Sequence, residues 1–220
     1  MRLAASICTS FPECARSLGA KARHTGTPIR PLIYHGSRER ALALTGFSGE
    51  KPVLMMIGGS LGAQTVNAVL REALPVLLTD FDVLHVCGRG NLDPDRQGTP
   101  GYFQVEYLNE ELPDAFALAD ILLSRAGSNS LSEILALRKP ALLIPYHSGR
   151  GDQVLNAESL RKRGLANVLP QGEMTSYRMV TELRNLYNHR DVLQRELDRL
   201  PDADGTQAVL EEIHAHCRRQ

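Results

Sequence analysis

Hydrophobic and polar positions follow two different periodicities along this chain, and the two alternate. Short, mostly apolar runs occur at 53–57, 82–87, 103–108, 120–124, 141–144 and 166–169. Runs of this length are typical of strands buried on both faces of a parallel sheet. Between most of them, apolar residues recur every three or four positions, as they do in amphipathic helices. The alternation predicts an α/β fold: a doubly wound parallel sheet of about six strands with helices on both faces.

The helical patterns of the central part of the chain have clear starts and stops. One helix is expected to begin near Ala63, another to cover 112–119, and a third to follow Gly127. A fourth begins near Asp152 and runs to 162, with Gly164 just beyond it. Glycine at that position favours a left-handed residue that closes the helix.

The two ends of the chain are less regular. Beyond the last apolar run, 174–200 and 204–218 are predicted as two helices separated by Pro201 and Gly205. Before the first buried strand, we expect a strand or helix end at 3–11, a loop at 17–27, and a loop with a short helix at 35–51.

Composition narrows the class of protein without identifying it. Apolar residues make up 43% and charged residues 23%, and 25 basic side chains balance 25 acidic ones. This balance gives no indication of nucleic acid or of a strongly anionic surface as a partner. No apolar run approaches the roughly 18 residues of a membrane-spanning helix, and we interpret the opening MRLAASICTSF as ordinary sequence rather than as a signal peptide. The four cysteines have no metal-ligand spacing and are expected to be buried free thiols; they are Cys8, Cys14, Cys87 and Cys217.

The segment 124–157 contains most of the candidate chemistry. Small residues from Gly127 to Ser130 follow a buried strand and open a helix. Such a helix start lies at the carboxyl edge of a parallel sheet, where its free backbone N–H groups favour phosphate. One turn further on, Glu133 is placed to accept hydrogen bonds from a sugar diol. At the start of the next helix, Asp152, Gln153 and Asn156 are suited to binding hydroxyl groups.

A second glycine turn, GGSLG at 58–62, follows the strand at 53–57. Glycine there lets backbone N–H groups approach a diphosphate without an intervening Cβ atom. The same turn could equally serve packing alone. It does not match the nicotinamide-binding fingerprint, because its glycines are wrongly spaced. The next strand also ends in Gly88 and Arg89 rather than in an acidic residue.

Taken together, the runs GSNSLSE and RGDQVLNA, with GGSLG upstream, resemble the donor-sugar signature of the MurG family. Members of that family are bacterial N-acetylglucosaminyltransferases that make lipid II. They consist of two Rossmann-like domains in the GT-B arrangement. The resemblance covers nearly the whole chain and corresponds to the C-terminal, UDP-GlcNAc-binding half. It implies transfer of GlcNAc from UDP-GlcNAc to undecaprenyl-pyrophosphoryl-MurNAc-pentapeptide (lipid I), by a cytoplasmic enzyme peripheral to the inner face of the membrane.

The resemblance also assigns roles to residues of the donor site. It implies that Arg30 lies near the pyrophosphate, that Leu108 shapes the uracil pocket, and that Glu133 binds the ribose. Residues implied to surround the diphosphate are Gly58, Gly59, Ser60, Gly62, Ser128, Asn129 and Ser130, and those implied to bind the sugar hydroxyls are Asp152, Gln153 and Asn156. No metal and no cofactor beyond the donor substrate are expected.

A domain boundary is implied near residue 30. The stretch TSFPE…HTGTPIR resembles the segment that closes the first domain of MurG-like proteins. We therefore expect 1–30 to be the tail of an N-terminal domain plus a linker, and 31–220 to be the C-terminal, UDP-GlcNAc-binding domain. The catalytic residues are unknown and are expected in the N-terminal domain, so this chain alone is expected to be inactive toward lipid I.

Two other functions stay open at the level of the sequence. The chain could be the donor-binding subunit of a split UDP-GlcNAc transferase, which would require a separate acceptor-domain chain. It could also be a UDP-sugar epimerase of GT-B fold. An epimerase needs acid and base groups in its cleft, and the loop at 145–153 offers only His147 and Asp152.

Overall fold

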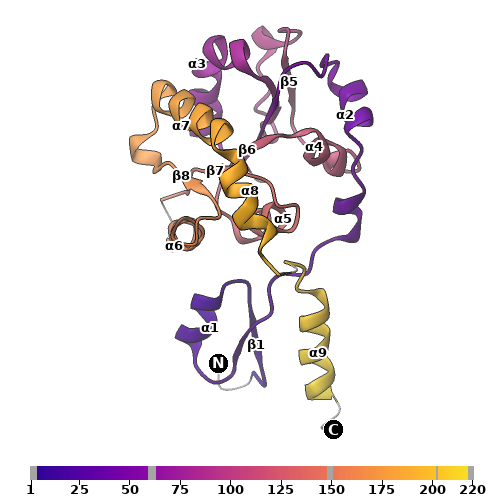
Figure 1. Cartoon of the computed structure of the whole chain (residues 1–220), viewed down its shortest axis with the longest axis vertical. Coiled ribbons are helices and arrows are strands. Elements are labelled where there is room, and N and C mark those ends of the chain that lie inside the picture. Colours follow the sequence, from indigo (N-terminus) through magenta and orange to yellow (C-terminus); the bar gives the residue numbers. More distant parts are fainter. Residues whose placement is uncertain (1–3, 59–62, 148–150, 202, 218–220) are drawn as a thin grey trace.

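A computed structural model describes residues 4–58, 63–147, 151–201 and 203–217 of the chain (Figure 1). Its central sheet has the strand order β5-β4-β3-β6-β7-β8, and all neighbouring strands are parallel. The strands are β3 (Val53–Ile57), β4 (Asp82–Val86), β5 (Tyr102–Val105), β6 (Ile121–Ser124), β7 (Ala141–Leu143) and β8 (Asn167–Val168). The predicted parallel α/β sheet of six strands is confirmed.

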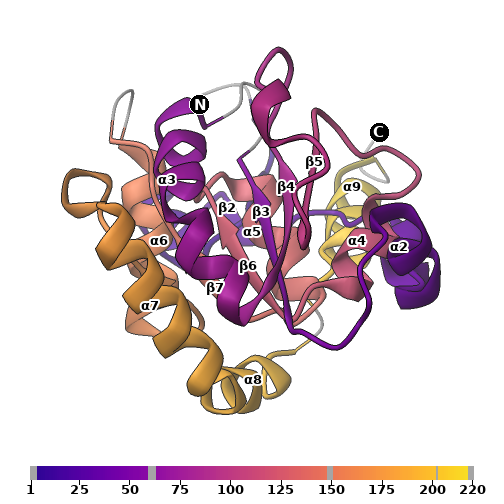
Figure 2. The same cartoon turned by 90° about the horizontal axis from the view of Figure 1, so that it is seen from above.

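Helices cover both faces of this sheet and bury two separate apolar cores. The connecting helices are α3 (Gln64–Asp80), α4 (Leu112–Leu118), α5 (Ser128–Ala136), α6 (Asp152–Lys162), α7 (Ser176–Asn188) and α8 (Arg190–Asp198). Figure 2 shows α3 and α7 together on one side of the strands, and α4 on the other. Leu70 of α3 and Leu183 of α7 share one core, whereas Phe116 of α4 and Leu131 of α5 belong to the second. The layered arrangement follows from strands that are apolar on both faces.

The helix predicted over 174–200 is in fact two helices. The first ends at His189, whose backbone (φ −111°, ψ 14°) leaves the helical region, and the second begins at Arg190. Leu183 in α7 packs into one core, while Leu197 in α8 packs into the core on the opposite face of the sheet. A single straight helix cannot reach both faces, so the chain turns between them.

The N-terminal residues form a small unit below the main sheet, and α9 lies beside it (Figure 1). The unit consists of β1 (Ile7–Thr9), α1 (Pro12–Leu18) and β2 (Ala22–His24), with β1 and β2 parallel, and α9 spans Thr206–Cys217. The predicted loop at 17–27 therefore contains a short strand. Ser6 Oγ donates to Glu212 of α9 at 2.7 Å. By this contact α9 belongs with the N-terminal unit, although it is the last helix of the chain.

Short helical segments join these parts. A 3₁₀ turn, η1 (Pro31–His35), and α2 (Arg38–Thr45) lead from the small unit into the main domain. There Arg40 of α2 makes a salt bridge to Asp114 of α4 at 2.6 Å. Two more 3₁₀ turns, η2 (Pro94–Arg96) and η3 (Gln171–Glu173), lie in loops.

Two smaller predictions need correction. All four cysteines are free thiols, but only Cys87 is buried, because Cys8, Cys14 and Cys217 lie at the exposed ends of the chain. The strand predicted over 103–108 ends at Val105, so Leu108 lies in the loop that follows β5. Among the described helices, none is both long and apolar enough to cross a membrane.

Candidate functional site

The candidate site lies where the strand order of the sheet reverses. From β3, the chain adds β4 and β5 on one side, then returns to place β6 on the other side of β3. Connections therefore leave the carboxyl ends of β3 and β6 in opposite directions and open a crevice between them. In open α/β sheets this switch point is where ligands bind. Gly58, which follows β3, and the helix start after Ser124 both lie at this crevice.

The first turn of α5 presents uncapped backbone N–H groups to the crevice. Gly127 is the N-cap residue, and no side chain caps the helix. Ser128 and Asn129 are exposed, and Ser130 is half-buried. A helix N-terminus carries a partial positive charge and free donors, so it attracts a phosphate group. The three predicted diphosphate residues of this turn thus occupy positions suited to an anion.

Gly58 shows why glycine is needed at the end of β3. A Cβ atom at this position would lie 2.8 Å from the Cβ of Ala63 and 2.9 Å from its backbone nitrogen. The turn must fold back so closely that no other residue fits without displacing backbone. The remaining predicted residues of this turn, Gly59, Ser60 and Gly62, lie outside the described residues.

Arg30 and Glu133 meet at the mouth of the crevice. An Nη2 of Arg30 donates to Oε1 of Glu133 at 3.2 Å. The arginine side chain is 69% exposed and the glutamate side chain 22% exposed. Both line a cavity of about 440 Å³ whose walls are the segment from Thr27 to Arg30 and the first turns of α5, including Asn129. The tertiary structure thus brings together two predicted site residues that are far apart in the sequence.

Gln153 and Asn156 form hydrogen bonds with the backbone that follows β6 and β7, and one polar atom of each amide stays available for a ligand. Oε1 of Gln153 accepts from Ala126 N–H at 3.3 Å and from Tyr146 N–H at 3.0 Å. Nδ2 of Asn156 donates to the Ala126 carbonyl at 3.1 Å. The described hydrogen bonds do not use Nε2 of Gln153 or Oδ1 of Asn156. Gln153 is therefore oriented to donate to a ligand hydroxyl, and Asn156 to accept from one.

The other predicted residues take more peripheral positions. Asp152 is exposed at the first position of α6, just after Gly151, whose positive φ of 73° forms the turn. Leu108 is partly buried against the core that contains Phe116. It lies in the loop that follows β5. The structure thus brings Arg30 and Glu133 together beside the start of α5.

Arg125 is a residue that the sequence analysis did not single out. It follows β6 directly and is buried. Its Nη1 donates to the Ile144 carbonyl at 3.1 Å and to Oε1 of Gln171 at 2.6 Å, and its guanidinium lies 5.3 Å from the ring centroid of Tyr146. Burial lowers the pKa of Arg125. The residue ties together the loops that follow β6, β7 and β8. The sequence signal was an arginine directly after the buried strand Ile121–Ser124.

The described residues offer binding groups but few acid or base groups. The carboxylates at the crevice are Glu133, which is paired with Arg30, and the exposed Asp152. His147 is exposed in the loop after β7. Within the described part of the chain, no group of three or more metal-binding side chains occurs. The arrangement is suited to holding an anion, a diol and further hydroxyls side by side.

This topology and crevice define a Rossmann-like ligand-binding domain of the kind found in GT-B glycosyltransferases. The solved structure of Acinetobacter baumannii MurG superposes with a TM-score of 0.73 at 22% identity, over 97% of this chain and 61% of that one. The calicheamicin glycosyltransferase CalG4 superposes with a TM-score of 0.62 at 17% identity, over 99% of this chain and 55% of that one. At these identities the likeness shows the fold, which is the predicted half of a GT-B enzyme.

The sequence comparison identifies the family. Residues 53–209 match the glycosyltransferase family 28 C-terminal domain, and the chain belongs to that family. A UDP-N-acetylglucosamine–N-acetylmuramyl-(pentapeptide) pyrophosphoryl-undecaprenol N-acetylglucosamine transferase of Geobacillus thermodenitrificans (strain NG80-2) is 45% identical over 213 residues, 96% of this chain. A protein of the same name from Clostridium botulinum (strain 657 / Type Ba4) is 40% identical over 215 residues. The chain spans about 60% of the length of these relatives.

Proposed function

We propose that this chain is the donor-binding part of a hexosyltransferase that moves GlcNAc from UDP-GlcNAc to undecaprenyl-pyrophosphoryl-MurNAc-pentapeptide and so forms lipid II. The observation that carries the proposal is the meeting of Arg30 with Glu133 beside the uncapped start of α5. The names of relatives that are 40–45% identical across nearly the whole chain support the same reaction.

The proposal gives each part of the crevice a task. The turn at Gly58, the start of α5 and Arg30 bind the diphosphate, because backbone N–H groups and a guanidinium all favour an anion. Glu133 accepts from the ribose diol. Leu108 contributes an apolar wall for the uracil. Nε2 of Gln153 donates to one hydroxyl of the sugar, and Oδ1 of Asn156 accepts from another. Asp152 binds a third hydroxyl.

The same groups assist departure of UDP. When the bond between the sugar and the diphosphate breaks, negative charge builds up on the leaving oxygen. Donors fixed at the start of α5 and the charge of Arg30 stabilise it without rearranging, which is the general advantage of preorganised electrostatics. The donor site proposed here uses no metal ion.

We also propose that residues 1–30 belong with a first domain that binds the acceptor. The small β1-α1-β2 unit and α9 lie together, apart from the main sheet (Figure 1). GT-B transfer takes place between two domains, and holding acceptor against donor supplies several kcal/mol of barrier lowering. We therefore expect the 220-residue chain by itself to bind donor and to transfer nothing.

A direct test uses the purified 220-residue chain with labelled UDP-GlcNAc and a lipid I analogue. Titration calorimetry with UDP-GlcNAc checks binding first, and thin-layer separation of labelled lipid then checks transfer, with and without a separately produced first domain of a MurG enzyme. Binding without transfer, followed by transfer once the domain is added, supports the proposal. Turnover by the chain alone would contradict it. Conversion of UDP-GlcNAc to its epimer would identify a UDP-sugar epimerase instead.

A further inference from the structure

Two linkers connect the small N-terminal unit with the main domain, and they touch at one point. The first linker, 25–30, leads into η1, and the second, 203–205, leads out to α9. Thr27 and Asp204 form an isolated β-bridge, and Gly205 N–H donates to the Thr27 carbonyl at 3.0 Å. A Cβ atom on Gly205 would lie 2.6 Å from the carbonyl oxygen of Thr25. Only glycine permits the linkers to approach so closely.

Asp204 joins the two linkers through its carboxylate oxygen Oδ1. Its Oδ1 accepts from the backbone N–H of Ile29 at 3.0 Å, from Thr206 N–H at 2.9 Å, and from the Thr206 hydroxyl at 2.6 Å. The Thr206 bonds fix the carboxylate at the start of α9. The Ile29 bond then holds the residue that immediately precedes Arg30. Hydrogen bonds to a charged acceptor are stronger than neutral ones.

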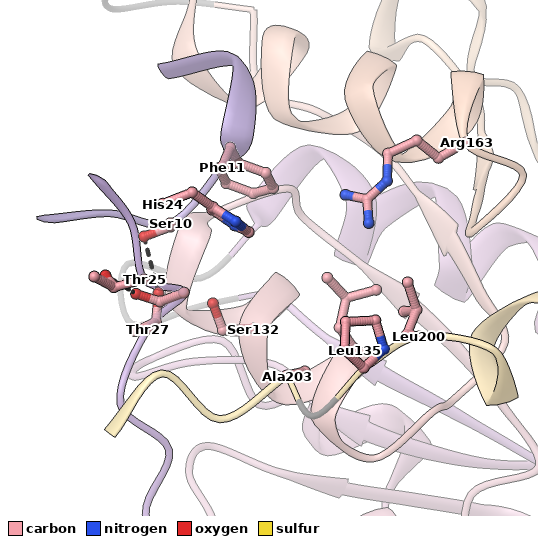
Figure 3. Close-up of a pocket in the computed structure, with 12 residues that line it drawn as sticks. Ser10, Phe11, His24, Thr25, Thr27, Ser132, Leu135, Arg163, Leu200 and Ala203 are labelled. Carbon is pink, nitrogen blue, oxygen red and sulfur yellow. Dashed lines mark hydrogen bonds between the residues drawn. The ribbon is translucent and has the colours of Figure 1, made fainter. Parts of the chain in front are cut away.

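The first linker is a wall between two cavities. On one side, Thr27 to Arg30 lines the cavity of about 440 Å³ that contains Glu133. On the other side, Thr25, Thr27 and Ala203 line a second cavity of about 260 Å³, across from Arg163 (Figure 3). A backbone segment with open space on both sides needs a tether to keep its position. The bond from Ile29 to Asp204 is such a tether, next to the arginine that reaches Glu133.

We propose that Asp204 is a positioning residue for the donor site, acting through Ile29 to aim Arg30 at the diphosphate. This inference rests on the proposed donor-binding function. Arg30 is mostly exposed and has a long flexible side chain. The position of its backbone therefore determines which positions its guanidinium can reach. A linker that is already fixed loses less conformational entropy when the ligand binds, and this loss is part of the free-energy cost of binding. Asp204 itself does not line the cavity of Arg30 and Glu133.

The experiment compares binding of UDP with binding of uridine, which lacks the diphosphate. Asp204→Ser keeps a short acceptor for Thr206 N–H and loses the carboxylate that reaches Ile29. We expect it to weaken UDP binding about three- to tenfold, measured by calorimetry, and to leave uridine binding, measured by ligand-observed NMR, unchanged. Asp204→Asn keeps the Oδ1 acceptor and is expected to bind UDP within about twofold of the parent. In an Arg30→Ala background, Asp204→Ser should cause no further loss.

Several outcomes overturn the inference. Equal loss of UDP and uridine affinity in Asp204→Ser means that the residue supports the fold in general, not Arg30. If the same variant keeps the UDP affinity of the parent, Oδ1 does not position Arg30. The same conclusion follows if Asp204→Asn loses as much UDP affinity as Asp204→Ser. An additional loss in the Arg30→Ala background shows that the effect does not pass through Arg30. If the parent chain binds no UDP, the proposed function fails and this inference fails with it.

Discussion

The guanidinium of Arg30 donates to the carboxylate of Glu133 at 3.2 Å, across 103 residues of sequence. The residue proposed to hold the diphosphate is thus paired with the residue proposed to hold the ribose. Arg30 is largely exposed, so this ion pair contributes little to stability. It places one positive and one negative group side by side, the two kinds of group that we propose for the diphosphate and for the ribose diol.

Replacing Glu133 should weaken nucleotide binding without unfolding the domain. A hydrogen bond to a charged acceptor contributes roughly 1.5–3 kcal/mol, so Glu133→Ala is expected to lower UDP affinity about tenfold or more. The thermal unfolding temperature should change little. The substitution removes the ion pair with Arg30, and this pair is largely in solvent because the Arg30 side chain is mostly exposed. Titration calorimetry gives the affinity and calorimetric scanning gives the unfolding temperature.

Glu158→Ala provides the matched control for this experiment. Glu158 also pairs with an arginine, Arg161, at 2.7 Å, but it lies on the surface of α6. The control should bind UDP like the parent. Equal affinities for Glu133→Ala and the parent would show that Glu133 does not contact the ribose.

Gln153 and Asn156 should discriminate the sugar rather than the nucleotide. Gln153→Glu keeps the acceptor for Ala126 N–H and Tyr146 N–H but removes the Nε2 donor. We expect it to lower UDP-GlcNAc affinity more than UDP affinity, because the sugar hydroxyl loses the donor from which it accepts. Asn156→Ala should have the same selective effect. The ratio of the two dissociation constants, measured by calorimetry, is the quantity to compare.

Asn156→Asp gives a different kind of control. It keeps an acceptor for the sugar but removes the Nδ2 donor and sets a carboxylate against the Ala126 carbonyl. This variant should lose thermal stability as well as affinity. If Gln153→Glu and Asn156→Ala weaken UDP and UDP-GlcNAc by the same factor, these residues lie away from the sugar.

The buried His85 should make stability depend on pH. Its Nδ1 lies 2.7 Å from the Tyr102 hydroxyl and its Nε2 lies 3.0 Å from Oδ1 of Asn67. Burial, together with the charge of Arg71, lowers the pKa of His85 to about 3. An unfolded histidine has a pKa of about 6.5. Between these values the unfolded chain binds more protons, so stability falls as the pH drops below about 6.5.

The contribution of His85 can be isolated by a difference measurement. A single group of this kind changes the free energy of unfolding by at most about 1.4 kcal/mol per pH unit. We expect His85→Gln, which cannot take up this proton, to be less stable at pH 7.5 but to lose less on going to pH 5. Urea unfolding at several pH values checks this. Parallel pH profiles for parent and variant would show that His85 does not cause the decline.

The pattern of apolar and polar residues predicted the six strands of the main sheet and most of its helices. The apolar runs at 53–57, 120–124 and 141–144 predict strands because a chain that is apolar on both faces has to be covered on both faces. The glycine turn before Ser128 predicts a helix start at the carboxyl edge of the sheet. This prediction, too, depends only on residues that are neighbours in the sequence. The sequence motifs also indicate Arg30, Glu133, Gln153 and Asn156 as candidate site residues.

Contacts between segments that are far apart in the sequence depend on the tertiary structure. Arg30 with Glu133 and Asp204 with Ile29 are pairs of residues 103 and 175 positions apart, and no local pattern encodes such distances. The sequence pattern also did not predict the break at His189. Helical periodicity shows that one side of a helix is apolar, but it does not show which core that side faces. Likewise α9 lies beside β1 although it follows the main domain in sequence. Periodicity predicts which residues of one element are buried. Which elements contact one another depends on how they pack in space.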